Sequence, residues 1–197
     1  MAKTLLQLAG ADLTPPPLAE TAVVVIDAQR EYVDGGLRLP GVDAALDNIA
    51  ALLAAARAAG APAVHVRHRG RPGGLFDPEK TAFELAPQAA SLPGEAVVDK
   101  GLPNGFAGTT LKDVLDAAGR KRLVLAGFMT HMCVSSTARA ALDLGFSTVV
   151  LSDATATRDL PAPGGNGVVA AASLHEAELA ALADRFAIVC TTAELVR

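Results

Sequence analysis

The chain has 197 residues, of which 51% are hydrophobic and 19% charged, and its formal net charge at pH 7 is -4. This composition predicts one globular domain spanning residues 1–197 and excludes a disordered chain, while the mild charge provides no basic surface for nucleic acid or an anionic membrane. Two cysteines, no signal peptide and no apolar span of roughly 20 residues predict a cytoplasmic protein without a disulfide framework.

Short apolar runs alternate with Ala-rich helical stretches along the chain. Thr21–Asp27 is a continuous β-branched run, typical of a strand buried on both faces. In Val42–Ala59 the apolar residues recur at helical spacing, and Gly60 and Pro62 follow as stop signals. Five further strands are predicted at Ala61–His68, Glu95–Lys100, Arg122–Phe128, Ser147–Ala154 and Phe186–Thr192.

Helical patterns and loops separate these strands. Thr110 and Asp113 resemble a capping box at the start of one helix, and Asn166 can serve as the N-cap of another. Loops rich in Gly and Pro are predicted at 69–94 and 155–165. The helices are predicted at Thr110–Ala118, Cys133–Leu144 and Gly167–Asp184. This alternation predicts an α/β fold, a three-layer α/β/α Rossmann-like sandwich with a mostly parallel six-stranded sheet.

Three chemically competent residues follow predicted strands. Ligands of open α/β sheets bind beyond the carboxyl ends of the strands. Asp27 ends the first strand, Lys100 ends the third, and Cys133 lies just past the fourth, where a helix begins. Singly, each is more often structural, as a turn carboxylate, a solvated cation or a small buried hydrophobe. Together they supply a base, a cation and a nucleophile whose thiol pKa we expect Lys100 and the helix N-terminus to lower.

Four segments carry a resemblance to a known family. They are VVVIDAQREY with Asp27, VDKGLPNGFAGTTL with Lys100, LVLAGFMTHMCVSSTARAALDLGF with Cys133, and SDATATRDL starting at Ser152. In this order and spacing the chain resembles the isochorismatase-like cysteine hydrolases, which include nicotinamidases, N-carbamoylsarcosine amidases and ureidoacrylate amidases. The resemblance covers roughly Thr21–Thr192.

The resemblance implies a catalytic triad of Asp27, Lys100 and Cys133. It also implies a cis peptide bond between Phe128 and Met129, with the backbone N–H groups of Met129 and Cys133 forming an oxyanion hole. The implied reaction is thioester-mediated hydrolysis of a C–N bond in a small amide, ureido or carbamoyl substrate, without a cofactor. Family members commonly form homo-oligomers, so the resemblance implies a dimer or tetramer.

The histidines of the second strand bear on metal binding. Nicotinamidases carry a metal-binding element after this strand, but here His65 and His68 stand without an Asp ahead of them. Residues three apart in a strand point to opposite faces, so these two side chains cannot share one metal there. No metal is therefore predicted. His68, at the end of the strand, can reach the pocket as a substrate contact or lie in the following loop.

Four further residues are substrate-binding candidates, each with a structural alternative. Gln29 can orient the substrate or the groups behind it, or cap a helix or turn. Tyr32 and Phe106 can form an apolar wall or pack in the core. His131 can contact the substrate or a neighbouring subunit, or be exposed to solvent. His175, beside acidic neighbours, is expected on a solvated helix face.

Other functions stay open at this point. Isochorismatases of the family break a vinyl ether and, by the resemblance, do not need the cysteine, so the presence of Cys133 favours C–N hydrolysis. A non-catalytic small-molecule-binding protein on the same scaffold would be expected to have lost one of the three residues. A redox protein would favour a nearby resolving cysteine, and Cys190 is the only other one. The substrate itself depends on the 69–94 loop and on any partner subunit.

Overall fold

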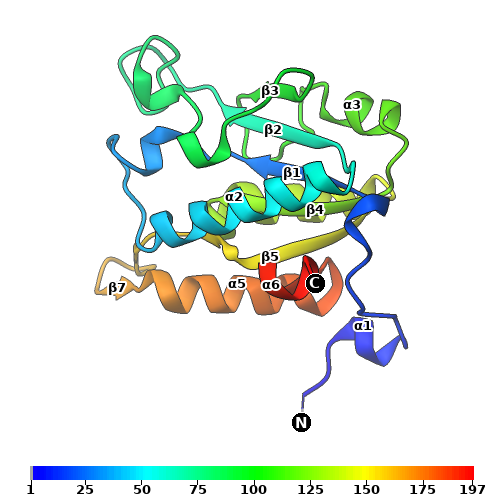
Figure 1. Cartoon of the computed structure of the whole chain (residues 1–197). Coiled ribbons are helices and arrows are strands. Elements are labelled where there is room, and N and C mark those ends of the chain that lie inside the picture. The colour runs from blue at the N-terminus through cyan, green and yellow to red at the C-terminus, as the bar shows by residue number, and fades with distance from the viewer. Residues whose placement is uncertain (1) are drawn as a thin grey trace.

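The computed structural model describes residues 2–197. The strands of its main sheet are β1 (Thr21–Ile26), β2 (Ala63–His68), β3 (Ala96–Lys100), β4 (Arg122–Phe128), β5 (Ser147–Ala156) and β8 (Ile188–Cys190). Their order across the sheet is β3-β2-β1-β4-β5-β8, and every neighbouring pair is parallel (Figure 1). The predicted α/β fold is confirmed, with β1 and β4 at the centre of the sheet.

Helices cover both faces of this sheet (Figure 1). They are α2 (Val42–Ala58) and α6 (Thr192–Leu195) on one face and α3 (Leu111–Ala117), α4 (Ser135–Asp143) and α5 (Ala171–Arg185) on the other. All six residues of β1 are buried, with Val23 and Val25 in the core under α2 and Val24 and Ile26 in the core under α3 to α5. A strand covered on both sides has no polar face, which explains its uninterrupted apolar run.

The predicted cap of α3 is wrong in detail. Thr110 precedes the helix, but its side chain makes no capping hydrogen bond. The hydroxyl of Thr109 instead accepts a hydrogen bond from the backbone N–H of Leu111 at 3.2 Å, and it donates one to the carbonyl of Gly105. The helix start is therefore tied to the preceding loop and not to its own first turn.

The start of α5 also differs from the prediction. Asn166 is not its N-cap, because the chain first forms a two-stranded hairpin, β6 (Leu160–Pro161) with β7 (Val168–Val169). The first N–H of the helix, on Ala171, donates to the carboxylate of Asp159 at 2.7 Å. A cap supplied from 12 residues away leaves no local sequence signal.

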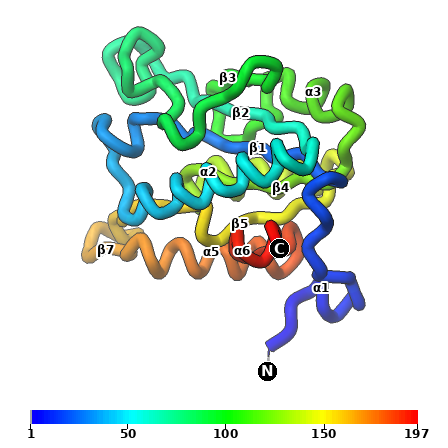
Figure 2. Tube along the Cα trace, in the orientation of Figure 1, coloured from blue at the N-terminus to red at the C-terminus, as the bar shows by residue number. Residues whose placement is uncertain are grey.

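The N-terminal segment runs along the edge of the sheet where the strands begin. It contains the short helix α1 (Leu5–Leu8), which lies beside α5 (Figure 2). The N–H of Leu5 donates to the carboxylate of Asp184 at 2.8 Å, which fastens the segment to the end of α5. Within residues 2–197, no helix is both long and apolar enough to cross a membrane.

Gly127 allows β4 to approach β1 closely just before the predicted oxyanion residue. Its φ is +112°, and a Cβ added there would lie 1.9 Å from the carbonyl oxygen of Ile26. The register between β4 and β5 also shifts between Leu125 and Gly127. Only glycine combines this backbone conformation with so close a contact.

We expect Gly127→Ala to destabilise the fold by at least about 3 kcal/mol, because the added methyl group overlaps the backbone of β1 and the φ value is unfavourable. The matched control is Gly145→Ala, where φ is +80° but nothing lies within 4 Å of the added Cβ, with an expected cost of about 1 kcal/mol. Urea unfolding of both variants measures the difference, and equal costs would contradict the close-approach argument.

Candidate active site

Asp27, Lys100 and Cys133 meet at the edge of the sheet where the strands end. Asp27 directly follows β1, Lys100 is the last residue of β3, and Cys133 lies in a π-helical turn after β4. Because β2 separates β3 from β1, the long side chain of Lys100 reaches past the end of β2. Its Nζ lies 2.7 Å from Oδ2 of Asp27 and 3.3 Å from Sγ of Cys133. The lysine and aspartate side chains are both fully buried.

A sharp backbone turn directs Asp27 into this site. Its φ is +49°, a left-handed conformation that Asp adopts more readily than most residues. Its N–H donates to the carbonyl of Val66 at 2.8 Å, and its own carbonyl accepts from the N–H of Gln29 at 2.7 Å. The carboxylate meets Lys100 as an ion contact, since neither of its oxygens accepts a well-directed hydrogen bond within residues 2–197.

Cys133 belongs to a short segment that we call the Cys133 turn, Thr130–Val134. The helix predicted to begin at Cys133 begins two residues later, at Ser135. The carbonyl of Met129 accepts the N–H groups of Met132 and Val134 at 3.0 and 3.2 Å, which closes the turn. The Phe128–Met129 peptide bond is cis, as the resemblance implies. Single π-helical turns of this kind occur frequently at functional sites.

The expected lowering of the Cys133 pKa is wrong. Burial, followed by the negative charge of Asp27, raises the pKa of the thiol to about 12, although Lys100 opposes both effects. Burial also raises the pKa of Asp27, against the opposing charge of Lys100. One ammonium faces two acidic groups, and the carboxyl is the stronger acid, with an ordinary pKa of about 3.9 against about 8.5 for a thiol. Burial thus opposes the charged forms of both acidic groups, and Lys100 is the cation that opposes this effect at each.

His68 is the third neighbour of the buried ammonium. Its Nδ1 lies 3.3 Å from Nζ of Lys100, and its ring meets Phe76 edge-on with centroids 5.2 Å apart. Burial, and then the charge of Lys100, lower the pKa of His68. A neutral imidazole can accept a hydrogen bond from the ammonium. The place of His68 beside Lys100 is consistent with its prediction as a pocket residue.

Gln29 does not face the site as a free amide but orients backbone groups beside it. Its Nε2 donates to the carbonyls of His68 and Phe83 at 3.0 and 2.8 Å, and its Oε1 accepts the N–H of His68 at 2.8 Å. Glu31 similarly accepts the N–H of Phe76 at 3.0 Å. These two buried side chains fasten the 69–94 segment beside the strand ends.

Of the two predicted wall residues, only Tyr32 lies near the catalytic candidates. It is buried edge-on against Phe76 and Phe128, with centroids 5.0 and 5.7 Å away, and burial together with the Asp27 charge raises its pKa. Phe106 stacks on Phe146, which is the residue directly before β5. It therefore packs near the end of the sheet where strands begin, and its prediction as a substrate contact is corrected.

His131 lies at the side of the site formed by the chain after β5. Its Nδ1 is hydrogen-bonded to the hydroxyl of Thr157, and burial followed by the charge of Arg158 lowers its pKa. Arg158 also influences the pKa of Tyr32 through its charge. The sequence gives no signal for this cation other than its position two residues beyond the end of β5.

His65 and His68 have separate partners. Nε2 of His65 lies 3.0 Å from a carboxylate oxygen of Glu95, which also pairs with Arg57 at 2.8 Å, whereas His68 faces Lys100. In the part of the chain that the structure describes, no three His, Cys, Asp or Glu side chains are grouped so that they could hold a metal ion. Glu95, just before β3, thus links β2 through His65 to α2 through Arg57.

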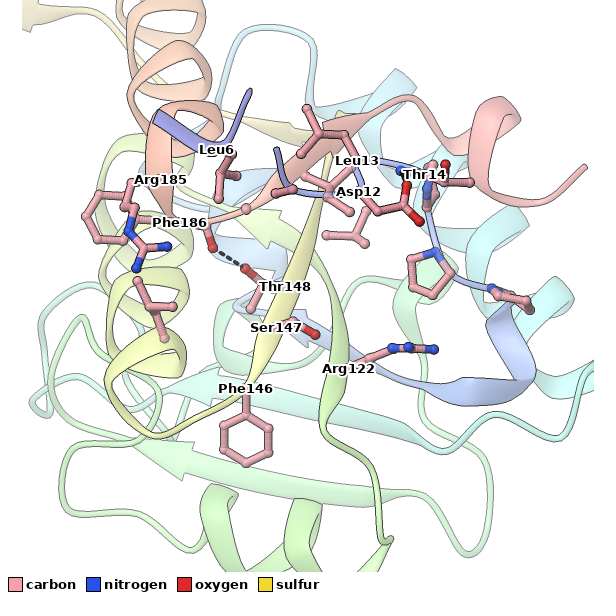
Figure 3. Close-up of a pocket in the computed structure, with 18 residues that line it drawn as sticks. Leu6, Asp12, Leu13, Thr14, Arg122, Phe146, Ser147, Thr148, Arg185 and Phe186 are labelled. Carbon is pink, nitrogen blue, oxygen red and sulfur yellow. Dashed lines mark hydrogen bonds between the residues drawn. The ribbon is translucent and has the colours of Figure 1, made fainter. Parts of the chain in front are cut away.

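A cavity of about 520 Å³ is lined by a different set of residues (Figure 3). Its lining includes Arg122 and Ser147, which begin β4 and β5, and Leu13 of the N-terminal segment. Thr148 donates to the carbonyl of Phe186 at 2.8 Å in its wall. Since parallel strands begin at one edge and end at the other, this cavity is not part of the candidate active site.

Residues 21–194 match the Isochorismatase domain model. The chain belongs to the isochorismatase family. The crystal structure of an isochorismatase from Pseudomonas putida KT2440 superposes with a TM-score of 0.94 and 44% sequence identity, over 99% of this chain and 100% of that one. The predicted family and its hydrolase fold are therefore confirmed.

Two curated relatives indicate the range of the family around this chain. The secreted isochorismatase effector Isc1 of Verticillium dahliae is 39% identical over 185 residues, which is 92% of this chain and 94% of Isc1. The ureidoacrylate amidohydrolase RutB of Variovorax paradoxus is 30% identical over 181 residues, covering 72% of each protein. The chain is an isochorismatase-family hydrolase whose relatives include an amidohydrolase.

We expect Asp27→Asn to lower the pKa of the Cys133 thiol, because it removes a negative charge that raises this pKa and leaves the Lys100 charge unopposed. The pH dependence of iodoacetamide alkylation at Cys133, measured by mass spectrometry, should shift toward lower pH. Asp116→Asn, at an exposed position of α3, is the control and should leave the profile unchanged. A profile for Asp27→Asn that stays in place or moves to higher pH would contradict this electrostatic assignment.

Proposed function

We propose that this isochorismatase-family enzyme hydrolyses a C–N bond of a small amide, ureido or carbamoyl compound through a thioester on Cys133. The observation that carries the proposal is the buried contact chain in which Lys100 lies 3.3 Å from Sγ of Cys133 and 2.7 Å from Asp27. A nucleophile beside a base and a compensating cation is the arrangement that acyl transfer requires. The amidohydrolase among the relatives supports the same reaction class.

In the first half-reaction, Sγ of Cys133 attacks the carbonyl carbon while its proton passes to Asp27. The resulting oxyanion accepts hydrogen bonds from the backbone N–H groups of Met129 and Cys133. Asp27 then donates the proton to the departing nitrogen, the C–N bond breaks, and ammonia or an amine leaves. One oxyanion donor typically contributes about 2.7–4 kcal/mol to lowering the barrier.

In the second half-reaction, a water molecule gives a proton to Asp27 and attacks the thioester carbon. The C–S bond breaks, the carboxylic or carbamic acid product leaves, and the sulfur recovers the proton from Asp27. Lys100 keeps its charge throughout and balances the negative charge as it moves between carboxylate, sulfur and oxyanion. The raised pKa of Cys133 fits this scheme, because a neutral thiol needs an adjacent base.

Vinyl ether hydrolysis is the second candidate function, because Isc1 and the Pseudomonas putida relative are both named as isochorismatases. The two reactions differ in their products and in their need for sulfur. Hydrolysis of isochorismate that survives Cys133→Ala would favour the vinyl ether reaction, whereas ammonia release that depends on Cys133 would favour C–N cleavage.

Two expectations accompany the proposal. Cytoplasmic location is supported by the two free cysteines, although the relative Isc1 is described as secreted. Assembly into a dimer or tetramer rests on the family resemblance. Both stay predictions, testable by cell fractionation and by light scattering of the purified protein.

We expect Cys133→Ala to reduce ammonia release from the best substrate of a small-amide screen by at least about 10³-fold, because the bond-forming atom is removed. The control is Cys190→Ala, which changes a half-buried thiol in β8 and should keep activity within about threefold. Mass spectrometry of the wild-type enzyme should detect an acyl group on Cys133 during turnover. Near-normal ammonia release by Cys133→Ala would refute the proposed nucleophile.

A further inference from the structure

A histidine of α5 is bonded to the Cys133 turn. Nδ1 of His175 lies 2.9 Å from the hydroxyl oxygen of Thr130, the first residue of the turn, and its Nε2 lies 3.1 Å from the carbonyl oxygen of Ser152 in β5. Thr130 is fully buried, and His175 is partly buried. The expectation that His175 lies on a solvated helix face is therefore wrong.

The chemistry of the two contacts determines the direction of both hydrogen bonds. A carbonyl oxygen only accepts, so Nε2 of His175 carries the hydrogen and donates to Ser152. In the neutral ring Nδ1 is then an acceptor, and the Thr130 hydroxyl must donate to it. Burial lowers the pKa of His175 and thus favours this neutral form. The resulting chain fixes the Thr130 hydroxyl relative to β5.

A second contact from the same face of α5 reaches the residue directly after the Cys133 turn. Glu178, three residues after His175, accepts hydrogen bonds from the hydroxyl of Ser135 and, at 3.0 Å, from Arg139. Residues three apart lie on one face of a helix. Helix α5 is therefore bonded to Thr130, three residues before Cys133, and to Ser135, two residues after it.

Thr130 directly follows Met129 and lies three residues before Cys133, so it joins the two proposed oxyanion donors. Rotation of the Thr130 backbone would move both N–H groups and the sulfur relative to Asp27 and Lys100. Misplacement of reacting groups by about 1 Å can cost about 10²-fold in rate. A hydrogen bond that fixes Thr130 therefore acts on the chemical step. Within residues 2–197, no hydrogen bond or ion pair joins His175 itself to Asp27, Lys100 or Cys133.

We propose that His175 is a positioning residue that holds the oxyanion donors and the nucleophile in place through the hydroxyl of Thr130. The inference rests on the proposed function of Cys133 as the nucleophile. It assigns α5 a part in catalysis beyond covering the sheet.

Two substitutions separate the two bonds of His175. In His175→Asn the side-chain amide ends near the position of Nδ1, so its oxygen can still accept from Thr130 while the bond to Ser152 is lost. In His175→Gln the amide reaches the position of Nε2 and keeps the bond to Ser152, while the acceptor for Thr130 is lost. Thr130→Val removes the hydroxyl at nearly constant volume, and Thr130→Ser keeps it.

The probe is p-nitrophenyl acetate, whose acyl group is transferred to Cys133 with release of p-nitrophenol. We expect the acylation rate at saturating ester to fall about tenfold or more in His175→Gln and Thr130→Val, with KM nearly unchanged. His175→Asn and Thr130→Ser should stay within about threefold of the wild type. The double variant His175→Gln/Thr130→Val should be no slower than either single variant, because both remove the same bond.

Equal rates in His175→Asn and His175→Gln, or additive losses in the double variant, would overturn the proposal in favour of a purely structural role. If His175→Gln fails to fold, the Thr130→Val and Thr130→Ser pair decides by the same criterion. If wild-type Cys133 is not acylated at all, the proposed function fails instead. Hydrogen–deuterium exchange of residues 129–136 then decides separately: exchange faster in His175→Gln than in His175→Asn supports the positioning contact, and equal exchange refutes it.

Discussion

The buried ammonium of Lys100 is the charge around which the site is built. A cation removed from water is stable only where opposite charge and hydrogen-bond acceptors replace its hydration, and here Asp27, Cys133 and His68 all lie within 3.3 Å of Nζ. Those partners come from the ends of β1, β4 and β2, and the lysine comes from β3. The parallel sheet is what brings the ends of four strands to one edge, so the fold and the charge balance of the site depend on each other.

In the proposed reaction, this charge balance also bears on which group acts first. Because burial and the Asp27 charge raise the pKa of the Cys133 thiol, the proposed reaction needs a base to take the thiol proton before the sulfur attacks. The site therefore resembles a serine-type nucleophile and base more than a preformed thiolate. The segment that carries Cys133 is also held from outside, since α5 is bonded to Thr130 of the Cys133 turn and to Ser135 directly after it.

The two edges of the sheet have different roles. Where the strands end, Gln29 and Glu31 fasten the 69–94 segment with hydrogen bonds to its backbone, and aromatic rings pack beside the catalytic candidates. Where the strands begin, the N-terminal segment encloses a cavity that contains none of these residues. The proposed chemistry therefore belongs to the edge where Asp27, Lys100 and Cys133 converge.

The sequence by itself determined the fold class, the six strands and the helices that separate them. It also indicated Asp27, Lys100 and Cys133 as candidate site residues at the strand ends. These features follow from local patterns, namely apolar runs, helical spacing and the residue at each strand end. Only the tertiary structure decided the hydrogen-bonding of Gln29, the place of Phe106, the cap of α5 by Asp159 and the contact of His175 with Thr130. It also reversed the expected pKa shift of Cys133. Each of these depends on burial or on partners distant in the chain, and the properties of single residues and their sequence neighbours contain no information about either.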